Sequence, residues 1–197
     1  MLLNKDEFVQ CAIEAGLIVN EDWLKEPDYV NSLLIDLGKF AVESCDYLGK
    51  GIGRVAYRFR NWVIKINRDF VNVDSEYDEY EGHYDSYNLL DSAKMSEVPE
   101  VAESEGMKQM MREMNWYSRA SSEDLEYVAK IYACSDNYAI QIAEYCNEVD
   151  EEDLYDDDYE MTDEYTFLSD NFSDTHPGNL GYNRDGKLVM IDLGWEI

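Results

Sequence analysis

Two aspartates and an asparagine late in the sequence have the chemistry and spacing of a magnesium site. Asp174 and Asn179 are five residues apart in the stiff turn DTHPGN, and Asp192 follows thirteen residues later, after the hydrophobic run KLVMI. Oxygens of one carboxylate and one amide, facing a second carboxylate on a neighbouring strand, can hold Mg²⁺. The remaining carboxylate is then available to orient or deprotonate a hydroxyl. Phosphoryl transfer requires this division of labour, because the reaction depends on positioning and charge neutralisation.

A cationic segment, residues 50–68, predicts a pocket for a polyanion. The chain has 44 Asp and Glu against 16 Lys and Arg, which gives a formal net charge of −28. The segment nevertheless contains no carboxylate, and it carries six cations: Lys50, Arg54, Arg58, Arg60, Lys65 and Arg68. Acidic residues are rare in β-strands, so a strand would explain the missing carboxylates, but it would not explain six cations. The segment begins in a glycine-rich turn, whose N–H groups can approach phosphate oxygens.

The composition also limits the partners and the compartment. A net charge of −28 argues against binding to nucleic-acid backbones or to anionic membranes, so a basic protein or a cationic small molecule is the expected partner. The oligomeric state stays open. Four separated cysteines, with no C-x-x-C pair and only two histidines, argue against a zinc site and fit reduced thiols. With no signal peptide and no membrane-spanning run, we expect a soluble cytoplasmic protein.

The elements that must position these residues predict an α+β fold. Residues 1–46 are expected to form two helices, one capped by Asn4 and ending at Gly16, the other capped by Asp28 after Pro27. Residues 47–66 are expected to form two or three antiparallel strands with a turn at Arg60–Asn61. Further helices are expected over 72–92, 106–119 and 160–171, a hairpin over 127–134 and 138–146, and a turn over 183–186 before the final strand.

Taken in order, the motifs of residues 47–195 resemble the protein-kinase-like superfamily. LGKGIGRVA (48–56) is similar to the glycine-rich loop over ATP phosphates, although Gly49, Gly51 and Gly53 make it one residue tighter than usual. VIKI (63–66) is similar to the lysine-bearing strand, which implies that Lys65 binds the α- and β-phosphates. IAEYC (142–146) is similar to the hinge, which implies that adenine lies against the backbone of Glu144 and Cys146.

The end of the chain is similar to the catalytic loop and metal strand of atypical, aminoglycoside-phosphotransferase-like kinases. The resemblance implies that Asp174 is the catalytic base, Asn179 a metal ligand, and Asp192, in the position of the D-F-G aspartate, the main metal ligand. His176 is expected to make a loop-stabilising hydrogen bond. The implied fold has two lobes: a helical extension (1–46), an antiparallel-sheet N-lobe with hinge (47–146) and a reduced C-lobe (147–197).

The sequence departs from the family pattern in two further places. The glutamate that pairs with Lys65 has three candidates, Glu76, Glu79 and Glu81, and Glu76 is preferred because its helical face also carries two tyrosines, Tyr80 and Tyr87. No arginine precedes Asp174, so control by activation-loop phosphorylation is not expected.

Two functions of different classes follow. The first is a minimal phosphotransferase that uses ATP and Mg²⁺ on a basic protein or a cationic small molecule. The second is a kinase-derived acidic protein without activity, a pseudokinase that occupies the nucleic-acid site of a host protein in the manner of phage-encoded inhibitors. An α+β domain with no ligand ranks last, because it makes the spacing of Asp174, Asn179 and Asp192 a coincidence.

Overall fold

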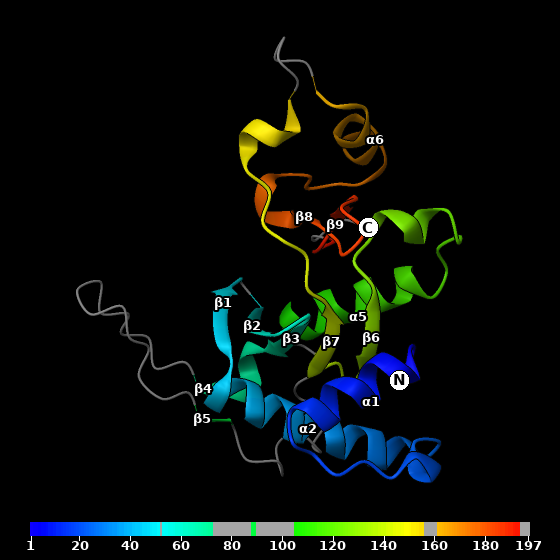
Figure 1. Cartoon of the computed structure of the whole chain (residues 1–197), viewed down its shortest axis with the longest axis vertical. Coiled ribbons are helices and arrows are strands. Elements are labelled where there is room, and N and C mark those ends of the chain that lie inside the picture. The colour runs from blue at the N-terminus through cyan, green and yellow to red at the C-terminus, as the bar shows by residue number, and fades with distance from the viewer. Residues whose placement is uncertain (52, 73–87, 90–104, 156–160, 194–197) are drawn as a thin grey trace, which may run out of the picture. The chain divides into compact units, whose positions relative to one another are not determined.

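The computed structural model describes residues 1–51, 53–72, 88–89, 105–155 and 161–193. They form an α+β fold that divides into two compact units. The sheet unit comprises residues 1–108 and 131–143, and the hairpin unit comprises residues 109–130 and 144–197. Each unit is described by itself below, and Figure 1 labels the elements.

The sheet unit is built on a five-stranded antiparallel sheet (Figure 1). Its strand order is β1-β2-β3-β7-β6, with β1 Asp46–Lys50, β2 Arg54–Phe59, β3 Trp62–Asn67, β7 Ile140–Glu144 and β6 Ile131–Cys134. Arg60 at the β2–β3 turn has φ 54, and Tyr138 at the β6–β7 turn has φ 56. These tight turns confirm the predicted strands of residues 47–66 and the predicted later hairpin.

The described residues of this unit also include the helices α1 (Lys5–Glu14) and α2 (Pro27–Ser44). The Asn4 side chain accepts a hydrogen bond from the Glu7 N–H, as expected of the first cap. Asp28 does not cap α2: the helix begins at Pro27, after Glu26, and no side chain caps it. Proline has a fixed φ and no N–H, so it suits the first helical position, and the helix starts two residues earlier than a cap at Asp28 would give.

The core of the sheet unit lies between these helices and the sheet. Phe8 and Leu34 are fully buried against strand residues such as Ile64 and Ile140. The apolar side of α2 is therefore a packing face. Its other buried members are Val30, Leu33, Leu37 and Ala41.

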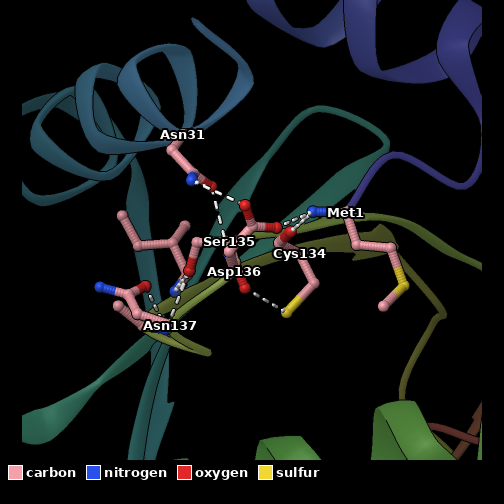
Figure 2. A network of polar contacts seen from close by, with 8 residues as sticks. Met1, Asn31, Cys134, Ser135, Asp136 and Asn137 are labelled. Carbon is pink, nitrogen blue, oxygen red and sulfur yellow. Dashed lines mark hydrogen bonds and ion pairs between the residues drawn. The ribbon is translucent and has the colours of Figure 1, made fainter. Parts of the chain in front are cut away.

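The first residues of the chain pair with the outer edge of β6 (Figure 2). The Cys134 N–H donates to the Met1 carbonyl at 2.9 Å, and the Met1 ammonium donates to Asp136 Oδ1 at 2.9 Å. Asn31 of α2 and Asp136 exchange two further hydrogen bonds, each 3.1 Å long. These bonds satisfy backbone groups at the sheet edge and join it to α2.

A short ladder replaces part of the helix expected over 72–92. Strands β4 (Val71–Asn72) and β5 (Asn88–Leu89) pair antiparallel, so the helix prediction is wrong at residues 72, 88 and 89. The helix prediction relied on local periodicity in that acidic segment, and a local pattern does not reveal pairing between residues far apart in the sequence. The rest of the predicted helix lies outside the described residues.

The hairpin unit contains most of α5 (Glu105–Tyr117), the helix α6 (Asp163–Asn171), and the hairpin of β8 (Leu180–Tyr182) and β9 (Leu188–Met190). These confirm the last two predicted helices and the turn before the final strand, where Asn183 Oδ1 accepts two backbone N–H bonds and Gly186 has φ 77. Its apolar core includes Val128, Leu154, Leu168, Leu180, Leu188 and Met190. Among the helices of the described ranges, none has the length and apolar character needed to cross a bilayer.

Candidate functional site

The β8–β9 hairpin brings the backbone of Asn179 next to that of Ile191, the residue before Asp192. Leu180 pairs with Met190, and continuing the ladder by one pair places Asn179 opposite Ile191. The Ile191 N–H donates to the Asn179 carbonyl at 2.8 Å, so the ladder does continue. Asp192 is the next residue. The thirteen-residue spacing seen in the sequence is therefore the span of one short hairpin.

Asn179 also holds Asp174. The Asn179 Nδ2 group donates to Asp174 Oδ2 at 3.0 Å and to the Asp174 carbonyl at 2.9 Å. Asp174 has φ 60, a left-handed conformation that aspartate tolerates better than most residues. Because Nδ2 makes both bonds, the amide orientation is set and its acceptor Oδ1 faces away from Asp174. The Asp174 side chain remains 49% exposed, so a solute can reach its carboxylate.

His176 makes the loop-stabilising hydrogen bond that the sequence predicts. Its Nδ1 accepts from the Gly178 N–H at 3.1 Å, and its Nε2 lies 3.7 Å from Asp174 Oδ1. In the neutral ring that fits these contacts, the proton is on Nε2 and faces the Asp174 carboxylate. A side chain at residue 178 would come within 3.0 Å of the histidine ring, which accounts for the glycine there.

Helix α6 and aromatic packing fix the loop that carries Asp174. The Tyr165 hydroxyl donates to the Thr175 carbonyl at 3.3 Å. Burial raises the pKa of Tyr165, so the phenol stays protonated and able to donate at neutral pH. Phe172, two residues before Asp174, packs against Trp116 of α5 with ring centroids 5.6 Å apart.

The sequence interpretation did not identify Gln109 as part of this site. Gln109 of α5 is only 8% exposed, and its Nε2 donates to Asp192 Oδ1 at 3.1 Å. Glu113, one turn later, is a second buried polar residue of α5. The methionines Met107, Met110 and Met114 of α5 are also buried. The sequence did contain one signal for this site, because the long polar residues Gln109 and Glu113 are four residues apart, on the same side of a helix, and lie among the methionines.

In the sheet unit, the predicted phosphate-binding residues lie on β1 (Gly49), in the turn between β1 and β2 (Gly51 and Gly53) and on β3 (Lys65). Gly49 of β1 pairs with Ala56 of β2, and Ala56 pairs with Lys65 of β3. Directly paired residues project from the same face of a sheet, so Ala56 lies beside Lys65 and Gly49 lies one strand further along the same row. The Gly51 N–H donates to the Arg54 carbonyl at 2.9 Å and closes the turn between β1 and β2.

Neither packing nor backbone conformation requires glycine at positions 49 and 51. A Cβ added at either residue would meet nothing within 4 Å, and neither has a left-handed φ. Gly106 contrasts with them, because its added Cβ would lie 2.0 Å from the Gly53 carbonyl oxygen. Gly49 and Gly51 thus leave open space next to the Lys65 row, whereas Gly106 allows the start of α5 to approach the turn.

The predicted hinge residues Glu144 and Cys146 are both buried. The Glu144 N–H donates to the Lys130 carbonyl at 2.8 Å, and its carboxylate lies 3.9 Å from Arg184 Nε. The Glu76 prediction, with its alternatives Glu79 and Glu81, lies outside the described residues. Within the described ranges, no group of three His, Cys, Asp or Glu residues is placed to hold a metal ion. The predicted set is of a different composition, because one of its three members, Asn179, is an amide.

Comparisons with known proteins give no family for this chain. No known family and no curated protein matches it. Seven chains of solved structures match, among them the one titled "High resolution (2.2 A) crystal structure of WbdD", with a TM-score of 0.37 and 11% identity. That match covers 75% of this chain and 31% of the other, so this chain spans about a third of the length of that one. A likeness this distant assigns no activity.

Proposed function

We propose that the protein is a phosphotransferase that uses ATP and Mg²⁺. The proposal is carried by the hydrogen bonds from Asn179 to Asp174 and by the β8–β9 ladder, whose last bond joins Asn179 to Ile191, the residue before Asp192. In this proposal Asp174, Asn179 and Asp192 supply two carboxylates and an amide to one site. All of these groups offer oxygen ligands, as Mg²⁺ prefers, and none offers sulfur.

The sheet unit supports the same proposal with different groups. Its glycine turn joins β1 and β2, and Lys65 lies on β3, an order that protein kinases use to bind ATP phosphates. The open space at Gly49 and Gly51 suits backbone approach to phosphate oxygens. The two-lobed kinase-like architecture, with Glu144 and Cys146 as the adenine-binding hinge, is part of this proposal.

In this mechanism the residues have separate tasks. Asn179 and Asp192 would hold Mg²⁺, which supplies charge neutralisation for the phosphates. Asp174 is exposed, so it can accept the proton of an acceptor hydroxyl. The acidic surface favours an acceptor that is basic, either a Lys/Arg-rich protein or a cationic small molecule.

The test is transfer of labelled phosphate from ATP in the presence of Mg²⁺ and candidate acceptors. We expect Asp174→Ala and Asp192→Ala each to lower transfer by at least about a hundredfold. Asp170→Ala is the matched control, because Asp170 is an exposed aspartate of α6 four residues away. The proposal fails if no acceptor and no site on the protein itself is labelled, or if the two variants transfer as well as the parent.

The net charge of −28 favours a second candidate, an acidic protein that blocks a basic or nucleic-acid-binding protein. Such binding should be fast and should weaken steeply as salt is raised. Thermal unfolding with ATP and Mg²⁺ separates the two candidates. A nucleotide at one hundred times its dissociation constant stabilises the folded protein by about 2.7 kcal/mol, whereas the second candidate predicts no shift.

A further inference from the structure

Gln109 is an uncharged donor placed on a carboxylate of the proposed metal site. Its Nε2 donates to Asp192 Oδ1 at 3.1 Å from a side chain that is 8% exposed. A hydrogen bond to an ionised carboxylate is stronger than one between neutral groups, and burial shields it from competing water. The contact therefore restricts the orientation of the Asp192 carboxylate.

The helix that carries Gln109 also contacts the other half of the site. Trp116 lies seven residues further along α5, two turns of helix, and packs on Phe172 just before the turn that holds Asp174. One face of α5 thus touches both the segment that leaves β9 and the segment that enters the catalytic loop. A rigid helix with two such contacts can hold both segments in register.

We propose that Gln109 is the positioning residue that presents Asp192 to a divalent cation. The inference rests on the proposed function, since it assumes the metal role of Asp192. An arginine or lysine in this position would neutralise the carboxylate and compete with the cation. The amide of glutamine orients the carboxylate without adding a positive charge beside it. Outer groups that orient metal ligands commonly change metal affinity by about 10- to 100-fold when they are removed.

The experiment measures Mg²⁺ binding to the whole chain by calorimetric titration and by thermal unfolding, with MgCl₂ as the probe at constant ionic strength. Gln109→Leu keeps the size of the side chain but removes the donor, and we expect about 10- to 100-fold weaker binding. Gln109→Glu places a second carboxylate against Asp192, so the protein should melt lower without Mg²⁺ and recover when Mg²⁺ is added. Asn115→Leu, on the exposed side of α5, is the control and should bind like the parent.

The results separate this inference from the proposed function. If Asp192→Asn abolishes binding while Gln109→Leu binds like the parent, the role of Gln109 is refuted and the metal site stands. If Asp192→Asn binds like the parent, or the parent binds no Mg²⁺, both ideas fail. A purely structural Gln109 predicts equal losses of stability with and without Mg²⁺. If Gln109→Leu does not fold, recovery of Gln109→Glu by Mg²⁺ supports the inference and its absence refutes it.

Discussion

Replacing Gly106 by alanine should destabilise the protein although the residue is helical. In the interior of a helix, glycine to alanine normally stabilises by about 0.5–1 kcal/mol. Here the new Cβ would lie 2.0 Å from the Gly53 carbonyl oxygen, whereas an ordinary contact of carbon with oxygen is about 3.3 Å. The Gly53 oxygen already accepts the Arg68 N–H at 3.0 Å, so the backbone is not free to retreat.

The overlap of more than 1 Å with backbone exceeds what side-chain adjustment relieves. Overpacking of this kind costs about 1–3 kcal/mol, and we expect a net loss of about 2 kcal/mol in the free energy of unfolding. Relief requires movement of either the start of α5 or the turn at Gly53. Because that turn is the proposed phosphate-binding loop, the nucleotide affinity of Gly106→Ala should fall as well.

The assay is urea unfolding, followed by nucleotide binding on the fraction that remains folded. Gly51→Ala is the matched control, since its Cβ meets nothing within 4 Å, and its stability should stay within about 0.5 kcal/mol of the parent. Its nucleotide affinity should nevertheless decrease if phosphate oxygens approach the backbone of the turn. The reasoning is refuted if Gly106→Ala is as stable as the parent, and the phosphate role of the turn is refuted if Gly51→Ala binds nucleotide normally.

Three further predictions concern the packing and the charges. Gly181→Ala should lower the free energy of unfolding in a urea melt by about 1–3 kcal/mol, because the new Cβ would lie 2.6 Å from Cys146 Cβ. Gly49→Ala is the control and should not lower the free energy of unfolding, because a Cβ there meets nothing within 4 Å. The hydrogen bond from the Met1 ammonium lowers the pKa of Asp136 from its ordinary value of 3.8. The stabilisation from this ion pair is therefore present above pH 4 and is lost as the pH falls through the pKa of Asp136 in the folded protein. Asp136→Asn should lower the free energy of unfolding by less than about 1 kcal/mol at pH 7, because the pair is half exposed. In acid melts the same substitution should cost nothing. Burial raises the pKa of Cys11 to about 12, so a thiol reagent at pH 8 should label Cys11 only after unfolding, and rapid labelling of the folded protein would contradict this.

Local signals in the sequence predicted most of the secondary structure. The Asn4 cap, the turn at Arg60 and the turn at Asn183–Gly186 each depend on residues within one or two turns of chain, and all three are present. The α2 start was misplaced at Asp28 because a good capping residue followed a proline, and proline determined the start. Residues 72, 88 and 89 were assigned to a helix because strand pairing between distant residues leaves no local periodicity.

The candidate site was predictable where one turn determines it. A turn over Asn183–Gly186 sets the register of its two strands, and that register joins Asn179 to Ile191, the residue before Asp192. The bond from Asn179 to Asp174 likewise depends on a turn of six residues. Gln109 was not predictable in this way, because it is more than eighty residues away from Asp192 and its role arises only when α5 packs beside β9.

The open space at Gly49 and Gly51 bears on three explanations for glycines in a strand turn. Glycine occurs where the backbone requires a left-handed φ, where a neighbour leaves no room for Cβ, or where a ligand approaches the backbone. Gly186 satisfies the first explanation and Gly181 the second. Gly49 and Gly51 satisfy neither, and they lie in and beside a cationic segment of a chain with a net charge of −28. For Gly49 and Gly51 the remaining explanation is close approach of a ligand, and the proposed function supplies one in the phosphates of ATP.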